Sequence, residues 1–235
     1  MNKTLLILAL TTLASLGPLA VGKDAPPAEN ILAAVRHSTA QNEELTLDGH
    51  LRQRETGKKH PFRMTIRRTQ IAFLFEDTPQ HTVVLDLGGE TFRLRERHNG
   101  QGEFLDVPPP NYGQPLRGTG INYLDISLAY LYWPNPTYIK EDVVSERITW
   151  LVQVNNPRKD GPYAKLDIWV DQNTGGLLRM QGYDWQGRLV KKMEVKDVQT
   201  KESEGKKVWT LKKMEVLALD PEKRRVISRT YMEMK

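Results

Sequence analysis

The sequence has no cysteine among its 235 residues. This absence excludes disulfide bridges, thiolate metal ligands and thiol nucleophiles. It also removes the acceptor for a lipid attached through cysteine, so we expect no such anchor. The fold must then be stabilised by an apolar core, which a chain of this length can build.

Long hydrophobic runs are also scarce, and the main one lies at the N-terminus. Residues 1–22 read MNKTLLILALTTLASLGPLAVG, with Lys3 before the apolar run and small residues up to Gly22. This is the pattern of a secretory signal peptide cleaved near Gly22. A membrane span would need roughly 20 uninterrupted apolar residues, and Gly17 and Pro18 break the run. We therefore expect an exported, periplasmic protein whose residues 23–235 form a single soluble domain.

Patterns that indicate catalysis are sparse. The histidines are His37, His50, His60, His81 and His98, and no two have the local spacing of metal ligands. We therefore expect no metal site and no cofactor. Asp167, Asp171 and Asp184 could form the acid and base of a hydrolase. Their places on an outward strand position and at turns favour structural roles instead, so we do not expect an enzyme.

The net charge is +5, with paired lysines and arginines spread along the chain. Attraction to an anionic membrane surface or acidic partner is one interpretation. The other is that these residues form the solvent faces of strands, and the interleaved acids favour it. No nucleic-acid-binding motif is present, so nucleic acid is not an expected partner.

Alternation of apolar and polar residues dominates the chain and indicates antiparallel β-sheet with one buried face. Leu45, Leu47 and Leu51 alternate with polar residues, and similar patterns recur up to the C-terminus. Between Trp209 and Val216 the alternation changes phase, which predicts a β-bulge near Lys212. The pattern predicts about ten to eleven strands in a mainly β fold, an incomplete barrel formed by a curved sheet.

Two short helices are predicted beside the sheet. The first, ten to twelve residues long, follows Pro26-Pro27 and has Ala28, Ile31, Leu32 and Val35 on one face. The second covers residues 123–133, ends before a proline, and follows a proline-rich loop. Asn122 and Asp125 have the spacing of a capping box at its start.

A curved sheet that stays open needs its apolar face covered, and short helices can cover it. Ordinary core packing would explain the same apolar stripes. The aromatic and methionine side chains favour an adaptable surface for a flexible apolar ligand. The candidate residues of this hydrophobic cavity and its lid are Ile31, Leu32, Val35, Phe62, Met64, Ile66, Phe73, Phe92, Leu94, Tyr123, Leu124, Leu128, Leu131, Trp150, Leu166 and Ile168.

Two segments carry a resemblance to a known family: GINYLDISLAYLYW and YAKLDIWVDQNTGGLLRMQGYDWQGRLVKKMEV. They resemble the LolA-like family of outer-membrane lipoprotein-sorting proteins. The residues that carry the resemblance are Gly120, Tyr123, Asp125, Leu131, Trp133, Trp169, Val170, Asp171, Tyr183, Asp184, Gly187 and Lys191. It spans most of the chain after about residue 30.

The resemblance implies a half-barrel with helices over its open, hydrophobic face. It implies a periplasmic carrier that holds the acyl chains of lipoproteins or lipids and sorts them toward the outer membrane. The implied partners are this acylated cargo and membrane-associated donor and acceptor proteins, with the carrier itself a monomer. The alternative on the same fold is a periplasmic sensor or interaction module without a transport role.

Overall fold

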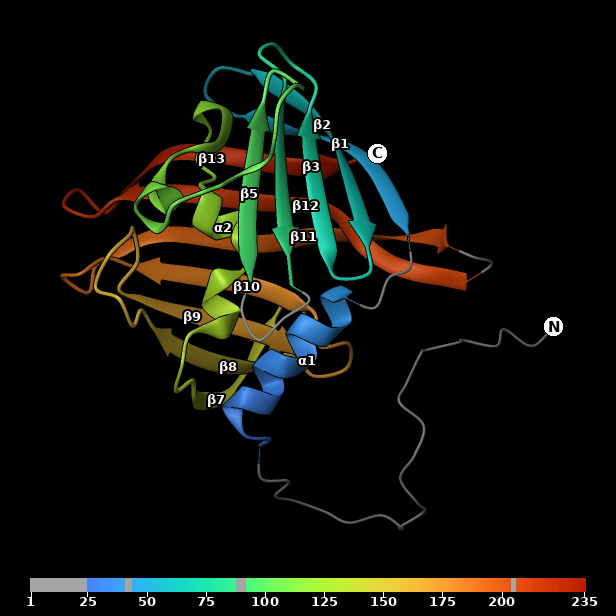
Figure 1. Ribbon diagram of the computed structural model, residues 1–235. Helices are drawn as coiled ribbons and strands as arrows, with labels where there is room; N and C mark the ends of the chain where they lie inside the picture. Colours follow the sequence, from blue (N-terminus) through green and yellow to red (C-terminus); the bar gives the residue numbers. More distant parts are fainter. Residues whose placement is uncertain (1–24, 41–43, 88–91, 204–205) are drawn as a thin grey trace.

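The protein is described from a computed structural model, which covers residues 25–40, 44–87, 92–203 and 206–235. In these residues every strand belongs to one 13-stranded antiparallel sheet that does not close into a barrel (Figure 1). The expected mainly β, open fold is confirmed, and the sheet is larger than the ten to eleven strands predicted. The predicted signal peptide, residues 1–22, lies outside the described residues.

The sheet consists of two meanders joined edge to edge. The first contains β1 (Leu45–Gln53), β2 (Lys59–Arg67), β3 (Gln70–Phe75), β4 (His81–Asp86), β5 (Arg93–His98) and β6 (Leu105–Asp106). The second contains β7 (Thr137–Val144), β8 (Arg147–Asn155), β9 (Lys165–Asp171), β10 (Leu177–Tyr183), β11 (Leu189–Ser203), β12 (Lys206–Asp220) and β13 (Arg225–Met234). Pairing of β1 with β13 joins them and leaves β6 and β7 at the two edges.

The two meanders cross steeply, so the sheet wraps around a concave side (Figure 1). The predicted alternation places one face of each strand there: Leu45, Leu47 and Leu51 of β1 are buried while Thr46 and Asp48 are exposed. Residues of both meanders and of the helices form one apolar cluster on the concave side. This cluster is the core of the protein.

The predicted β-bulge near Lys212 is confirmed. Leu211 pairs with Val198 and Lys213 pairs with Asp197, so Lys212 is left without an opposite residue at this register shift. The extra residue changes the phase of the alternation, so Leu211 and Met214, three positions apart, both pack against the apolar cluster.

The N-terminal helix α1 (Ala28–Ala40) begins directly after the proline pair. Ala28, Ile31, Leu32 and Val35 are buried in the apolar cluster, as the 3.6-residue periodicity predicts. In the described part of the chain, no helix has the length and apolar character needed to cross a membrane.

The middle of the chain, between β6 and β7, contains several short helical segments. They are the 3-10 turns η1 (Pro109–Gly113) and η2 (Leu116–Gly118), the helix α2 (Tyr123–Ser127) and the 3-10 turn η3 (Ala129–Tyr132). The prediction of one continuous helix over residues 123–133 is therefore wrong. Leu128 separates α2 from η3 with a left-handed backbone, φ +52°.

The side chain of Ser127 accounts for this break. Its hydroxyl donates to the Leu124 carbonyl (3.0 Å) and accepts from the Ala129 N–H (3.2 Å). Serine competes in this way with the hydrogen bonds of a regular helix. Leu124 and Leu131 are still buried in the cluster, and Leu128 packs against it while half-exposed.

Candidate functional site

The candidate binding surface is the concave face of the sheet together with α1, α2 and η3. All residues predicted for the cavity and lid lie in the one apolar cluster. Four of them, Ile66, Phe92, Leu128 and Trp150, are half-buried at its margin, and the others are buried. The sequence pattern therefore identified a spatially continuous apolar cluster, and its use by a ligand stays a prediction.

The short helix α2 is fixed at its start by the predicted capping box, which is confirmed. The Asp125 N–H donates to Asn122 Oδ1 (2.8 Å), and the Asn122 N–H donates to Asp125 Oδ2 (2.9 Å). A helix of five residues has little stability of its own. Its position depends on these caps and on contacts with the sheet.

A buried ion pair attaches α2 to the sheet. Lys191 of β11 donates to Asp125 Oδ2 (2.9 Å), and the side chain of Asp125 has no solvent exposure. Lys191 also donates to the carbonyl of Gly120. Tyr163 donates to the other carboxylate oxygen, Asp125 Oδ1 (2.7 Å), and burial raises the pKa of Tyr163. All polar atoms of the carboxylate are thus satisfied in an apolar setting.

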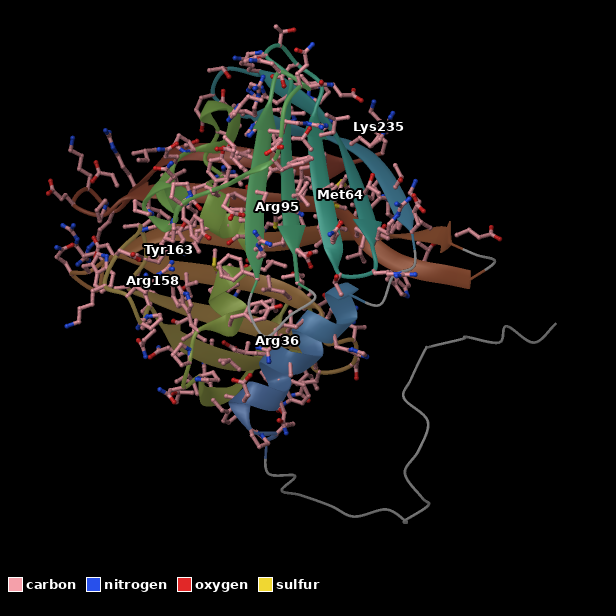
Figure 2. All side chains as sticks on the ribbon, viewed as in Figure 1. Arg36, Met64, Arg95, Arg158, Tyr163 and Lys235 are labelled. Atoms are coloured by element: carbon pink, nitrogen blue, oxygen red, sulfur yellow. The ribbon has the colours of Figure 1, made fainter. Side chains whose placement is uncertain are left out.

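Tyr163 can reach this position because β10 carries a glycine beside it. A side chain at Gly182 would place its Cβ 2.8 Å from the Tyr163 ring. Figure 2 shows Tyr163 between the mid-chain segment and the second meander. The sequence predicted Asp125 only as part of the capping box and gave Gly120 and Lys191 no role beyond the family resemblance. The structure shows that all three residues form one contact.

Arg36 of α1 also contacts this mid-chain segment. Arg36 donates to the Leu131 carbonyl of η3 (2.5 Å) and lies over the ring of Tyr132 (5.2 Å to its centre). Its second partner is Glu29 on α1 itself (2.7 Å). Figure 2 shows Arg36 where α1 passes the mid-chain segment.

A second polar cluster lies where the start of α2 meets β4 and β5. Glu96 Oε2 contacts His81 Nε2 (2.9 Å) and His98 Nε2 (3.2 Å) and accepts a hydrogen bond from the Tyr123 hydroxyl (2.5 Å). The two imidazole rings stack with centres 4.4 Å apart. Sequence spacing did not reveal this cluster, because antiparallel pairing places His81 opposite His98 although they are far apart in the chain.

The electrostatics of this cluster follow from burial and hydrogen bonding. Burial lowers the pKa of His81, more than Glu96 raises it. Burial alone would raise the pKa of Glu96, but hydrogen bonds with Tyr123 and His81 outweigh it and lower this pKa. Burial and the bond to Glu96 raise the pKa of Tyr123. At neutral pH the ionised Glu96 carboxylate therefore lies beside the neutral imidazole of His81 and the neutral phenol of Tyr123.

The aspartates considered for a hydrolase have structural partners. Asp171 accepts two hydrogen bonds from Arg147 (3.0 and 2.7 Å), and Asp184 accepts from the backbone N–H of Arg188 (2.8 Å) in its turn. Asp167 accepts from Gln153 on the neighbouring strand (2.9 Å). These contacts agree with the structural roles that the sequence favours.

These features define a class: an open antiparallel half-barrel whose apolar concave face is covered by short helices. A family model described as an uncharacterized protein matches residues 102–235, more than half of the chain, and the protein belongs to this family. A comparison with curated protein sequences gives no match.

Three bacterial proteins are among the solved structures with the same architecture. A LolA superfamily protein from Nitrosomonas europaea aligns with a TM-score of 0.61 at 11% identity, over 90% of this chain and 92% of that chain. A DUF1329 family protein from Desulfovibrio piger aligns with a TM-score of 0.59 at 13% identity, over 90% and 92%. A domain from Vibrio parahaemolyticus named for outer membrane lipoprotein sorting aligns with a TM-score of 0.59 at 14% identity, over 89% and 92%.

The resemblance to LolA-like proteins is thus confirmed at the level of the fold. At these identities the likeness concerns architecture, so cargo and partners belong to the proposal below.

Proposed function

We propose that the protein is a periplasmic carrier that holds acyl chains of lipoproteins or lipids against its concave face and delivers them toward the outer membrane. The observation that carries this proposal is the continuous apolar cluster between the sheet and α1, α2 and η3. Its lining is rich in Phe, Tyr and Met, which adapt well to flexible apolar chains. The fold shared with the LolA superfamily protein supports the same role.

The energetics of acyl chains require such a carrier in an aqueous compartment. Each methylene of an exposed chain costs about 0.8 kcal/mol. A chain of about fifteen methylenes therefore costs on the order of 12 kcal/mol to expose, and lipoproteins with several chains cost more. A carrier must cover the chains and still release them, so part of its cover must move at modest cost.

We assign the moving part to α1 and the fixed part to α2. The helix α2 is attached through the fully buried pair of Asp125 and Lys191, whose separation would leave buried charges unpaired. The helix α1 contacts the mid-chain segment through Arg36, a partly solvent-exposed side chain that donates to the Leu131 carbonyl. Displacement of α1 would uncover the apolar residues on which Ile31, Leu32 and Val35 rest.

Mass spectrometry of an organic extract of the purified protein tests the proposal. We expect acyl-chain lipids at a defined ratio to protein, together with displacement of a fluorescent fatty acid by added lipid. A protein that carries no lipid and binds no fluorescent fatty acid would not be an acyl carrier.

A second candidate function, a protein-interaction module without transport, is favoured by one observation. The edge strand β7 is unpaired on its outer side in the described sheet, and its Val143 lies opposite Ile148 with both side chains exposed. An edge of this kind can accept a strand from another protein. Stable co-purification of a protein partner without bound lipid would favour this function over the carrier.

A further inference from the structure

We propose that His81, Glu96 and His98 form a binding site for a divalent transition metal ion of the zinc type. His81 belongs to β4, and Glu96 and His98 belong to β5. One potential ligand atom from each residue lies within 4.8 Å of the other two. Two imidazoles and one carboxylate are a donor set of open zinc sites, in which water takes the fourth position.

The distances fit a tetrahedral ion with small adjustments. Metal–ligand bonds of 2.0–2.1 Å place neighbouring ligand atoms about 3.3 Å apart in a tetrahedron. Glu96 Oε2 lies 2.9 Å from His81 Nε2 and 3.2 Å from His98 Nε2. The two rings stack nearly parallel, with planes 9° apart, so their nitrogens point side by side, and the exposed His98 ring must turn to direct its Nε2 toward the ion held by His81 and Glu96.

Two of the three ligands are held in place by the fold. His81 and Glu96 have side-chain exposures of only 6% and 19%, and the register of β4 with β5 sets their positions. Tyr123, the first residue of α2, donates its hydroxyl to Glu96. A hydrogen bond of this kind orients a ligating carboxylate and tunes the metal site.

The third ligand gives the ion access. The side chain of His98 is 57% exposed, so a hydrated ion can approach from solvent and keep a water molecule. The nearby positive charge of Arg117 is paired with Asp77 (2.7 Å). Because the site has two imidazoles and one carboxylate, it favours zinc, copper or nickel over the oxygen-seeking magnesium and calcium ions.

Other histidine–carboxylate contacts in the described residues lack this combination. His50 contacts Glu233 (3.1 Å), but the same carboxylate also binds Arg52, and no second imidazole joins it. His50 is therefore a suitable control position. The inference opposes the sequence-based expectation of no metal site, which rested on local spacing and could not include cross-strand neighbours.

Isothermal titration of the tag-free full chain with zinc chloride tests the site. We expect one zinc ion per chain, no comparable binding of magnesium, and a rise of the melting temperature with zinc. His98→Ala should lower the zinc affinity at least about 100-fold, and Tyr123→Phe should lower it about 10-fold through the lost support of Glu96. His50→Ala should bind zinc as the wild type does.

Either of two results would overturn the site: no stoichiometric binding by the wild type, or equal binding by the wild type, His98→Ala and Glu96→Gln. Since His98 is exposed, His98→Ala should retain the wild-type circular dichroism spectrum and melting temperature without zinc. A loss of zinc binding in this variant would then result from the missing imidazole and not from unfolding. The measurement needs no lipid, and its outcome is independent of the carrier proposal.

Discussion

Lys191 of β11 and Asp125 of α2 form an ion pair, 2.9 Å between Nζ and Oδ2, in which both side chains are almost completely buried. The residues are far apart in the chain and lie on elements that share no backbone pairing. Such a pair adds little net stability, because desolvation offsets the attraction. Its effect is to fix the position of a helix too short to be stable alone.

Replacing Lys191 with methionine should therefore be strongly destabilising. The change leaves the Asp125 carboxylate buried without its counter-charge, which costs about 3–5 kcal/mol. Urea denaturation of Lys191→Met against the wild type measures this loss. Lys192→Met, on the neighbouring half-exposed position, should change stability by less than about 0.5 kcal/mol.

The double variant Lys191→Met with Asp125→Asn separates charge from packing. Without the charge on residue 125, we expect recovery of more than half of the lost stability. A double variant as unstable as Lys191→Met alone would show that the lysine acts through packing of its aliphatic chain.

The sequence predicted the sheet well because one-sided burial imposes period two on each strand. The alternation in β1 correctly predicted that Leu45, Leu47 and Leu51 lie on the buried, concave face of the sheet. The phase change around Lys212 correctly predicted the bulge. The capping box of Asn122 and Asp125 was also predicted correctly, because it depends on two residues only three positions apart in the sequence.

Contacts between residues far apart in the chain could not be predicted from the sequence in this way. Nothing local indicates that Lys191 reaches Asp125, or that His81 faces His98, because both depend on how strands pair and wrap. The break at Leu128 was missed for another reason. Its periodicity is helical, and the hydroxyl of Ser127 overrides that preference.

Removal of the arginine contact between α1 and η3 should speed ligand exchange if α1 is the moving cover. Arg36→Ala deletes the hydrogen bond to the Leu131 carbonyl, and we expect the dissociation rate of a fluorescent fatty acid to rise about 5- to 10-fold. Stopped-flow displacement measures this rate. Glu29→Gln removes only the exposed partner of Arg36 and should leave the rate unchanged. Equal rates in Arg36→Ala and wild type would exclude this contact as the restraint on opening.

The protein should lose stability in acid partly through Glu233 of β13. A bidentate hydrogen bond from Arg52 of β1, helped by Lys213, lowers the pKa of Glu233 from 4.5 to about 2. Because this pKa is lower in the folded state, its stabilising contribution is present above pH 4.5. It declines as the pH falls from 4.5 to about 2, since protonation then favours the unfolded chain.

Solvent screening limits this contribution to about 1 kcal/mol. Urea denaturation at pH 7, 4 and 2.5 should therefore show a smaller acid-induced loss for Glu233→Gln than for the wild type. Glu44→Gln, which removes an exposed surface pair with Arg67, should follow the wild-type profile. Identical pH profiles for Glu233→Gln and the wild type would refute the assignment.

Leu128→Asp tests whether the mid-chain segment contributes to a ligand surface. Leu128 is half-exposed and left-handed, a backbone conformation that aspartate tolerates better than most residues. We therefore expect the variant to fold, with a loss of about 1 kcal/mol or less. Its charge at the margin of the apolar cluster should weaken fatty-acid binding about 10-fold or more, since an acyl chain cannot solvate a carboxylate.

The fully buried Leu131 supplies the contrast. Leu131→Asp places the same charge inside the core and should cost several kcal/mol, giving little folded protein. Leu128→Asn keeps the tolerated backbone and a similar shape without the charge, and should bind more tightly than Leu128→Asp. Thermal melting beside fluorescent fatty-acid displacement distinguishes the three variants. A folded Leu128→Asp protein with wild-type affinity would count against a ligand surface at this segment, because a carboxylate there would then meet no acyl chain.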